Sequence, residues 1–226
     1  MTRRVKPYYS DDLVTLYHGD CLEVTEWLEA DALVTDPPYG LGDKMQGGPK
    51  WSTLWSGEKA DGRSRPMKWD MEAPVWIVDL VAGFDEAIVW GGNYFPLPPE
   101  RGWLVWDKIV RQFSSGHAEL AWTNLKQPVR AFSFSHGQLA SEGKQHPTQK
   151  PITLMEWCIG FTTDGKSVAD PFAGSGTTLV AAKRLGRRAI GVEREERYCE
   201  MAANRLSQGV LDFGGHAELI LEGETK

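Results

Sequence analysis

The residues whose types and spacing could carry chemistry begin at the end of an apolar run. Residues 34–40 read VTDPPYG, so a β-prone segment leads directly into Asp36, Pro37, Pro38 and Tyr39. Proline fixes φ at about −65°, so the backbone beside the acid is rigid before any ligand arrives. A carboxylate next to a fixed carbonyl supplies two hydrogen-bond acceptors, and Tyr39 supplies a flat aromatic face. An Asx turn that starts a proline turn would use the same residues, so this stretch alone leaves both interpretations open.

A second candidate site follows a later strand, at DPFAGSG, residues 170–176. The pattern is a strand ending at Asp170, a glycine turn, a helix, and a strand that ends at Glu193, about twenty residues further on. Such a turn leaves backbone N–H groups free at a helix N-terminus, where a carboxylate or phosphate is favoured. Glu193 is placed to accept hydrogen bonds from ribose hydroxyls. The unit predicts one half of a nucleotide-binding fold, although the turn departs from the GxGxxG fingerprint.

Alternating strands and helices must position these two motifs. Apolar runs bounded by turn residues predict strands at 13–20, 32–39, 87–92, 102–108, 129–135 and 188–193, and a strand entering the glycine turn within 167–176. Helices are predicted at 22–30, 74–84, 177–186 and 195–206. The pattern indicates an α/β fold in which 102–108 and 129–135 are adjacent strands. Residues 41–72 lack periodicity and are predicted as a long loop, and 209–226 is ambiguous.

Length and composition limit the class of protein. The 226 residues, 41% hydrophobic and 25% charged, fit one ordinary α/β domain. Three scattered cysteines without CxxC spacing indicate reduced thiols, and predict neither disulfides nor a metal site. The N-terminal residues form no apolar signal segment, and no run of about eighteen apolar residues occurs. We therefore expect a cytoplasmic protein that is neither secreted nor membrane-spanning. A net charge of −6 argues mildly against a large sequence-independent contact with nucleic acid.

Together, the two motifs resemble the S-adenosylmethionine-dependent DNA amino-methyltransferases. DPPY at 36–39 precedes the glycine motif at 170–176, which is the order of the permuted β subgroup. RNA and protein methyltransferases with similar tetrapeptides place the glycine motif first, so the order discriminates. Further stretches fit the same family: GDC at 19–21, WGGNYF at 90–95, WDK at 106–108, AELAW at 118–122 and HPTQKP at 146–151.

The resemblance spans residues 10–206. Within the family, the chain resembles small phage-type adenine-N6 DNA methylases. It implies a single Rossmann-like class I methyltransferase domain over residues 1–226. The expected sheet is mostly parallel and seven-stranded, with an antiparallel edge hairpin and a circularly permuted element order.

For catalysis, the resemblance implies that Asp36 and the carbonyl of Pro37 accept the two protons of an exocyclic amine. That amine is a poor nucleophile because its lone pair is delocalised into the ring, and fixed acceptors let the nitrogen pyramidalise as the methyl group arrives. Pro38 completes the rigid segment, and Tyr39 stacks on a base flipped out of the duplex. Asn93 is expected to line the same cleft. Aspartate rather than serine at the first motif position favours adenine over cytosine as the target.

The resemblance also implies S-adenosyl-L-methionine as the cofactor. Asp170 would hold the methionine ammonium directly or through the turn, residues 148–150 would reach the methionine carboxylate, and Asp20 or Cys21 would lie beside the adenine ring. Asp20 has an alternative role as the N-cap of the helix predicted at 22–30, and His146 is assigned no catalytic role. The full set of expected cofactor residues is Asp20, Cys21, Asp36, Thr148, Gln149, Lys150, Asp170, Phe172, Gly174, Ser175, Gly176, Thr177, Thr178 and Glu193.

Little of the chain is available for reading the DNA sequence. Only residues 136–144 fill the position where larger family members carry a target-recognition region, so we expect no separate recognition domain. Contacts with double-stranded DNA are assigned to the loop at 41–72, through stacking and phosphate binding. The residues expected to make them are Arg63, Arg65, Lys68 and Trp69. A short or relaxed target follows as a hypothesis, and a homodimer that shares recognition between two chains is the other arrangement considered.

Three alternatives accompany this interpretation. The acidic net charge leaves open an amine methyltransferase that acts on cytosine, on RNA or on a protein side chain. A catalytically inactive binding or assembly module would keep the fold, but every residue that the chemistry needs is intact. A nicotinamide-dependent dehydrogenase is disfavoured, because the glycine fingerprint differs and no second domain is predicted.

Overall fold

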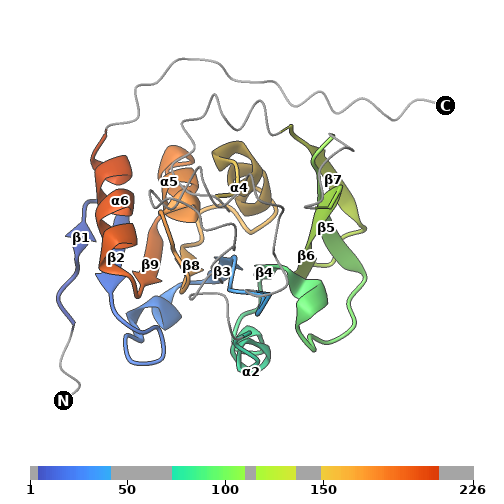
Figure 1. Ribbon diagram of the computed structural model, residues 1–226, viewed down its shortest axis with the longest axis horizontal. Coiled ribbons are helices and arrows are strands. Elements are labelled where there is room, and N and C mark those ends of the chain that lie inside the picture. Colours follow the sequence, from blue (N-terminus) through green and yellow to red (C-terminus); the bar gives the residue numbers. More distant parts are fainter. Residues whose placement is uncertain (1–4, 42–72, 110–115, 136–148, 209–226) are drawn as a thin grey trace, which may run out of the picture.

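The computed structural model describes residues 5–41, 73–109, 116–135 and 149–208 (Figure 1). Residues 42–72 of the loop expected to contact DNA lie outside the described residues, as does the stretch 209–226. What was expected of these segments therefore stays a prediction. No helix among the described residues is long and apolar enough to cross a membrane.

One mixed sheet organises the described part of the chain. Its nine strands lie in the order β1-β2-β9-β8-β3-β4-β6-β5-β7. The strands are β1 (Tyr9–Ser10), β2 (Val14–His18), β3 (Ala32–Thr35), β4 (Ala87–Trp90), β5 (Gly102–Asp107), β6 (Ala118–Thr123), β7 (Arg130–Ser133), β8 (Val168–Asp170) and β9 (Ala189–Glu193). From β2 to β4 the neighbouring strands are all parallel. β6 is antiparallel to both β4 and β5.

This sheet confirms the expected α/β fold with mostly parallel strands and an antiparallel hairpin, which β5 and β6 form. It has nine strands rather than seven, because β1 and β7 extend the central seven at the two edges. The hairpin consequently lies one strand inside the edge. The expected adjacency of 102–108 and 129–135 is confirmed, since β5 and β7 are parallel neighbours with Leu104 opposite Arg130.

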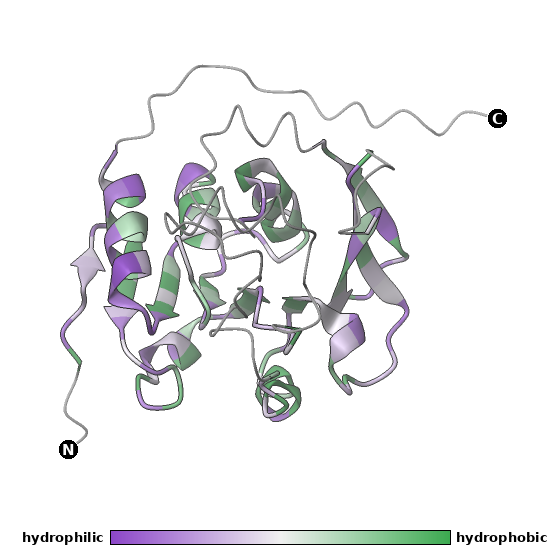
Figure 2. Ribbon diagram, in the orientation of Figure 1, coloured by the Kyte–Doolittle hydropathy of each residue, from purple (hydrophilic) through white to green (hydrophobic). Residues whose placement is uncertain are grey.

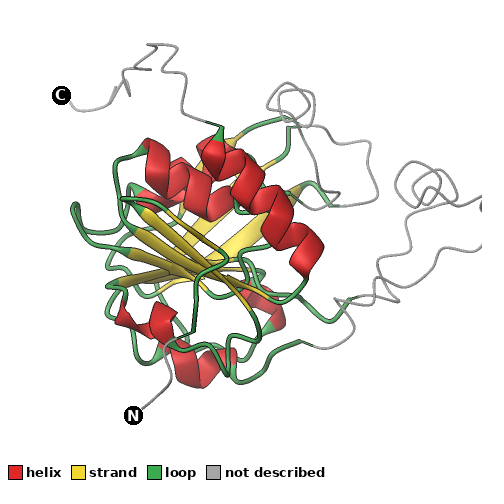
Figure 3. Cartoon of the chain, turned by 90° about the vertical axis from the view of Figure 1, so that its left-hand side faces the viewer, coloured by secondary structure: helices red, strands yellow, loops and turns green. Residues whose placement is uncertain are grey.

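Helices cover both faces of the sheet in a three-layer arrangement (Figures 1 and 3). The helical segments are η1 (Glu26–Glu29), α2 (Ile77–Val81), η3 (Gly92–Tyr94), α4 (Ile152–Ile159), α5 (Thr177–Arg184) and α6 (Glu196–Ser207). Successive strand residues point to opposite faces. Val34 therefore packs in the cluster that contains the buried residues of α4, α5 and α6, whereas its neighbour Leu33 packs with Trp27 and Ile77 of η1 and α2.

Hydropathy follows this layering. Figure 2 shows largely hydrophobic central strands, and alternating hydrophilic and hydrophobic bands along α6. The buried residues of α6 are Cys199, Ala202 and Leu206, which recur every three or four positions and so form one apolar side. The C-terminal unit of strand, glycine turn, helix, strand and helix is thus confirmed as β8, α5, β9 and α6.

The helix predicted at 22–30 is wrong in type, because the structure has only the 3-10 turn η1 there. Val24 and Trp27 are both buried and lie three residues apart, which is the period of a 3-10 turn. The Trp27 indole N–H donates to the carbonyl of Cys21 at 3.0 Å, which pins the short segment without a full helix.

Two further elements are shorter than their patterns suggested. The helix predicted at 74–84 forms only over α2, between a turn in which the Ile77 N–H donates to the carbonyl of Pro74 and one closed by the Gly83 N–H. The strand predicted at 87–92 ends at Trp90, because Gly91 has a left-handed φ of 67° that ends the extended conformation. In both cases the element is present as predicted, and turns at its ends make it shorter.

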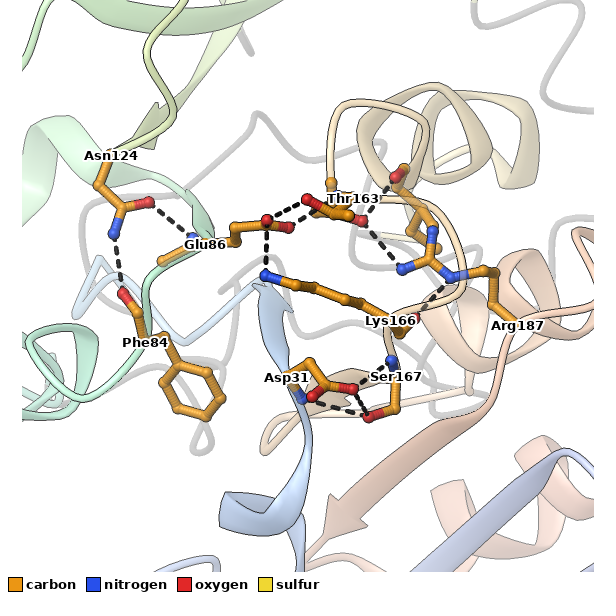
Figure 4. A network of polar contacts seen from close by, with 11 residues as sticks. Asp31, Phe84, Glu86, Asn124, Thr163, Lys166, Ser167 and Arg187 are labelled. Carbon is orange, nitrogen blue, oxygen red and sulfur yellow. Dashed lines mark hydrogen bonds and ion pairs between the residues drawn. The ribbon is translucent and has the colours of Figure 1, made fainter.

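A polar network ties the loops at the amino-terminal ends of β3, β4 and β8 (Figure 4). Glu86, just before β4, accepts hydrogen bonds from the Thr163 N–H at 2.7 Å and from the Lys166 ammonium at 2.8 Å. Asp31, just before β3, accepts from the N–H and the hydroxyl of Ser167, at 2.8 and 2.6 Å. This edge lies opposite the two motifs, so we interpret the network as structural.

Replacing Glu86 with glutamine is expected to destabilise the protein by about 1–2 kcal/mol at pH 7, because a buried, hydrogen-bonded carboxylate is lost. Burial alone would raise the pKa of Glu86, but Lys166 and Thr163 bring it below its ordinary 4.5. A carboxyl group with a lowered folded-state pKa contributes stability above the unfolded-state value and loses it as the pH falls. The difference in free energy of unfolding between the wild-type protein and Glu86→Gln should therefore shrink below about pH 4.5. Urea denaturation at several pH values measures it. The exposed Glu100→Gln is the control, and a difference that grows in acid would contradict the assignment.

Candidate active site

Both sequence motifs lie at the carboxyl edge of the parallel strands. DPPY follows β3 and the glycine turn follows β8, and these two strands are neighbours in the sheet. The Thr35 hydroxyl, at the end of β3, donates to Asp170 at the end of β8 at 2.7 Å, across 135 residues of sequence. Open α/β sheets bind ligands at this edge, where the loops after neighbouring strands meet.

Asp36 has a partner on each of its carboxylate oxygens. The Tyr39 hydroxyl donates to Oδ1 at 2.5 Å, and the Lys150 ammonium donates to Oδ2 at 2.7 Å. Lys150 also donates to the Tyr39 oxygen at 3.1 Å, which closes a triangle of polar contacts. The Asp36 side chain is 27% exposed, so the acid is fixed in place yet open to solvent on one side.

The ring of Tyr39 is wedged between a backbone and a second ring. It stacks on Tyr94 with centroids 5.0 Å apart and planes inclined by 22°. On another side it lies against Gly91, where an added Cβ would come within 2.1 Å of the Tyr39 Cε1 atom. Burial and the nearby Asp36 raise the pKa of Tyr39 well above its ordinary 10.0, so its hydroxyl stays protonated and donates. The expected base-stacking ring is therefore rigidly placed, with part of its surface already covered.

Asp170 is buried and holds the glycine turn. Only 2% of the residue is exposed. Its Oδ1 accepts the Thr35 hydroxyl and the Phe172 N–H, at 2.7 and 3.1 Å, and Thr178 at the start of α5 also donates to it. Burial raises the pKa of Asp170 from 3.8 to about 6, despite these donors. These contacts fix Asp170 against the start of the glycine turn.

The glycine turn needs glycine for two reasons, its backbone conformation and the lack of room at Gly176. Gly174 and Gly176 have left-handed φ values of 52° and 80°, and a Cβ on Gly176 would lie 2.8 Å from the Cβ of Ala202 on α6. Arg205 of α6 clamps the turn by donating to the carbonyl of Ser175 at 2.6 Å and to the Thr177 hydroxyl at 3.1 Å. The first turn of α5 is therefore held tightly against α6.

Glu193 ends β9 beside this turn, as expected. Its Oε2 accepts the Gly174 N–H at 2.8 Å, and its Oε1 accepts the Glu195 N–H at 2.7 Å. Burial raises the pKa of Glu193 above its ordinary value. The Arg194 N–H also donates to this carboxylate. An ionised carboxylate offers about four lone-pair sites, so capacity remains for a further donor such as a ribose hydroxyl.

The remaining expected cofactor residues border the same edge. Asp20 follows β2, and its carboxylate accepts the Leu22 N–H at 2.9 Å in a local turn. The alternative role as the N-cap of a helix at 22–30 is wrong, because the helical segment there begins only at Glu26. Cys21 is buried, and burial raises its pKa to about 12, which excludes a reactive thiolate. The Phe172 ring stacks on Trp76 with centroids 5.7 Å apart. Gln149 and Lys150 are both buried just before α4.

The other residues expected at the site are Asn93, Thr148 and the four assigned to the DNA. Asn93 is exposed in η3, beside the stacked Tyr94. Thr148 lies outside the described residues, and so do all four residues assigned to the DNA: Arg63, Arg65, Lys68 and Trp69. Their roles remain predictions.

Sequence reasoning missed residues that reach the site from distant elements. Glu119 of β6 pairs with Lys150 at 3.0 Å, and Arg205 binds the glycine turn. Gly91 makes room for Tyr39. Glu119 and Gly91 lie in the stretches AELAW and WGGNYF, which the resemblance had singled out, although no strand was predicted at AELAW.

Comparison with known proteins agrees with this geometry. A family model for DNA methylases, of the N6 and N4 amino-methyltransferases, matches residues 89–204, half of the chain. The protein YubD of Escherichia coli (strain K12) is 31% identical over 207 residues, covering 84% of this chain and 88% of its own. The chain is a DNA methylase of the N6/N4 family.

Other members of the DNA methylase family span nearly the whole chain. The Type II methyltransferase M2.DpnII of Streptococcus pneumoniae is 28% identical over 252 aligned residues, covering 89% of this chain and 92% of its own. The crystal structure of an M1.HpyAVI–SAM complex has the same fold, with a TM-score of 0.54, 21% identity, and coverage of 85% of this chain and 100% of that one. The PvuII DNA methyltransferase, described as cytosine-N4-specific, gives a TM-score of 0.52 at 18% identity, covering 89% of each chain.

Membership of the DNA methylase family confirms S-adenosyl-L-methionine as the cofactor. The residues at the glycine turn fit this group. A Cβ at Gly176 would collide with Ala202 of α6, so the glycine lets the N-terminus of α5 pack closely on α6. Two carboxylates, the buried Asp170 and the partly buried Glu193, end the flanking strands and suit a ligand that carries an ammonium, a sulfonium and ribose hydroxyls.

The burial of Asp170 makes cofactor binding dependent on pH. A cationic ligand favours the ionised carboxylate, and the pKa of Asp170 is about 6 in the cofactor-free protein. We expect the affinity for S-adenosyl-L-methionine to be nearly constant above that pH, and to fall below it by up to about tenfold per pH unit. Isothermal titration calorimetry between about pH 7.5 and pH 5 measures this slope.

The matched control for this slope is Asp170→Asn, which keeps the size of the side chain and removes its titration. The variant should bind more weakly at pH 7.5 and show a flatter slope. Glu193 remains in the variant, so any residual slope is assigned to its raised pKa. Parallel pH curves for the two proteins would show that Asp170 does not titrate on binding.

Proposed function

We propose that this DNA methyltransferase acts on the exocyclic amine of adenine in double-stranded DNA, and forms N6-methyladenine. The observation that carries the proposal is the Asp36 carboxylate, fixed at the end of β3 by Tyr39 and Lys150 while 27% of its side chain stays exposed. An acceptor that is fixed before the reaction need not reorganise as charge develops on the amine. Aspartate at the first motif position favours adenine over cytosine.

Bound S-adenosyl-L-methionine supplies an electrophilic methyl group, and the chain supplies its orientation. Glu193 and the glycine turn hold the nucleoside end, and Asp170 acts on the methionine end through the turn. Asp36 and the carbonyl of Pro37 accept the two amine hydrogens, so that the nitrogen lone pair turns toward the methyl group. Asp36 need not be a strong base, because the methylated nitrogen is acidic and loses its proton afterwards.

DNA contacts follow the same proposal. A base must leave the duplex to reach Asp36, which requires stacking and phosphate contacts. We assign these to Tyr39, Asn93 and the segment that contains Arg63, Arg65, Lys68 and Trp69. We further propose a single domain of the permuted β subgroup that acts in a bacterial or phage-infected cytoplasm. A role in a Type II restriction–modification system is supported by the Type II relatives. The target is short or loosely read.

Methylation of the cytosine amine at N4 is the second candidate. The matching family covers both amines, and the PvuII DNA methyltransferase, which has a similar fold, is described as cytosine-N4-specific. Both amines present the same pair of hydrogens to Asp36, so the acceptor geometry alone does not separate them. An RNA or protein amine as the target has weaker support, because the family is one of DNA methylases.

The deciding experiment uses labelled S-adenosyl-L-methionine and unmethylated duplex DNA, followed by digestion to nucleosides and mass spectrometry. N6-methyl-2′-deoxyadenosine supports the proposal, N4-methyl-2′-deoxycytidine replaces it with the second candidate, and transfer to RNA or protein but not to DNA overturns both. Methylome sequencing of cells that express the protein then defines the target. One long, strictly read site would overturn the proposal of loose recognition.

A further inference from the structure

A chain of alternating charges begins at Asp36 and runs away from the substrate side. The Lys150 ammonium contacts Asp36 Oδ2 at 2.7 Å and Glu119 Oε2 at 3.0 Å. The other oxygen of Glu119 pairs with the Lys108 ammonium at 2.7 Å. The four residues come from four places in the sequence: the end of β3, the segment before α4, β6, and the position just after β5.

The two lysines of this chain are almost completely buried. The side chains of Lys108 and Lys150 are 5% and 6% exposed. Each ammonium also lies near an indole ring, Lys150 at 5.2 Å from the Trp90 centroid and Lys108 at 5.3 Å from that of Trp106. A buried ammonium is costly without compensation, so Lys150 depends on Asp36 and Glu119, and Lys108 depends on Glu119.

Glu119 contacts both buried lysines. Burial alone would raise the pKa of Glu119, but Lys150 and Lys108 lower it to about 2. Burial alone would lower the pKa of Lys150, but Asp36 and Glu119 raise it well above 10.5. Glu119 and Lys150 are therefore both charged at neutral pH. Lys150 is not a nucleophile, since its nitrogen is protonated.

The contact between Lys150 and Asp36 has a consequence for catalysis. A carboxylate has about four lone-pair sites. Tyr39 occupies one on Oδ1 and Lys150 occupies one on Oδ2, which fixes the plane of the carboxylate from both sides. The remaining sites can then accept an amine in one orientation only. Without Lys150, only the Tyr39 hydroxyl would limit rotation of the carboxylate.

We propose that Lys150, held in place by Glu119, is a positioning residue that orients the Asp36 carboxylate for the target amine. The inference rests on the proposed function of Asp36. It also separates Lys150 from the cofactor-binding role implied by the resemblance, because the ammonium is already committed to Asp36, Glu119 and the Tyr39 hydroxyl. Lys150 acts through Asp36 and touches neither cofactor nor base.

The test compares three variants in the full chain: Lys150→Met, Lys150→Arg and Glu119→Gln. Lys126→Met, on an exposed lysine, is the matched control. For each protein, kcat and KM are measured on duplex DNA, the Kd for S-adenosyl-L-methionine by calorimetry, and Tm by thermal denaturation. Misplacing a reacting group by about 1 Å can cost about a hundredfold in rate.

We expect Lys150→Met and Glu119→Gln each to lower kcat by about tenfold or more, with Kd for the cofactor within about twofold of wild type. Lys150→Arg keeps the charge and should recover part of the loss. Because Glu119 acts through Lys150, combining Glu119→Gln with Lys150→Met should cost little more than Lys150→Met alone. If Lys150→Met does not fold, Glu119→Gln carries the test, since it keeps every group that contacts Asp36.

The outcomes separate this inference from the proposed function. A weaker Kd for S-adenosyl-L-methionine with unchanged kcat would assign Lys150 to the cofactor and overturn the inference. A lower Tm with unchanged kcat, measured where all variants are folded, would make the network purely structural and overturn it as well. If the wild-type protein transfers no methyl group to DNA, the proposed function fails first, independently of the variants.

Discussion

Replacing Asp36 with alanine is expected to abolish methyl transfer, lowering kcat by about a thousandfold or more. The side chain is the acceptor at which the target amine is expected to bind, and no other carboxylate is positioned by both Tyr39 and Lys150 among the described residues. Cofactor binding should largely persist, because Asp170, Glu193 and the glycine turn are unchanged. The measurements are single-turnover transfer to duplex DNA and the calorimetric Kd for S-adenosyl-L-methionine.

Two controls make this result specific. Asp36→Asn keeps the size of the side chain and one carbonyl acceptor, so it should retain more activity than Asp36→Ala while losing the ion pair with Lys150. Asp12→Ala removes an exposed acid elsewhere and should behave as wild type. Full activity of Asp36→Ala would refute the role of Asp36, and a large loss of cofactor affinity would move Asp36 to the cofactor side.

Replacing Gly91 with alanine is expected to lower kcat by about a hundredfold, although residue 91 touches no reacting atom. The new Cβ would lie 2.1 to 2.6 Å from three ring atoms of Tyr39, so the ring must move. The ring cannot move freely, since it stacks on Tyr94 and its hydroxyl binds both Asp36 and Lys150. Displacing Tyr39 should therefore disturb the acceptor and the stacking surface together.

The substitution also introduces backbone strain, which needs its own control. Gly91 has a φ of 67°, and a side chain in that region costs about 1–2 kcal/mol. Gly186 has nearly the same φ, 66°, but nothing lies within 4 Å of an added Cβ. Gly186→Ala should thus lose similar stability and keep its activity, with both measured by thermal denaturation and methyl transfer. Equal activity losses in the two variants would attribute the effect to strain rather than to Tyr39.

Local spacing made the cofactor half of the site predictable. Strand, glycine turn, helix and acid follow one another within 167–193, so their arrangement depends on hydrogen bonds and turns along a short stretch of chain. The structure accordingly places Asp170, the glycine turn and Glu193 together. The same locality explains where prediction went wrong. Residues 22–30 carry an apolar spacing compatible with two kinds of helix, and packing of Trp27 against Phe84 and the Cys21 carbonyl favours the shorter one.

The sequence by itself determined the family, the fold class and the identity of the two motifs. Residue types at fixed short spacings restrict the backbone, through proline, glycine and strand periodicity, and these restrictions act wherever the chain folds. Each motif follows a predicted strand. Because parallel strands bring their carboxyl ends to one edge of a sheet, both motifs are expected at that edge.

Only the tertiary structure decided what surrounds Asp36. Its contact with Lys150 crosses 114 residues of sequence, and Glu119 joins from β6. No local pattern encodes such a meeting, because it depends on which strands become neighbours and on which face each side chain leaves the sheet. The low exposure of Lys150 then decides that its charge must be paired, and Asp36 and Glu119 are the anions within reach.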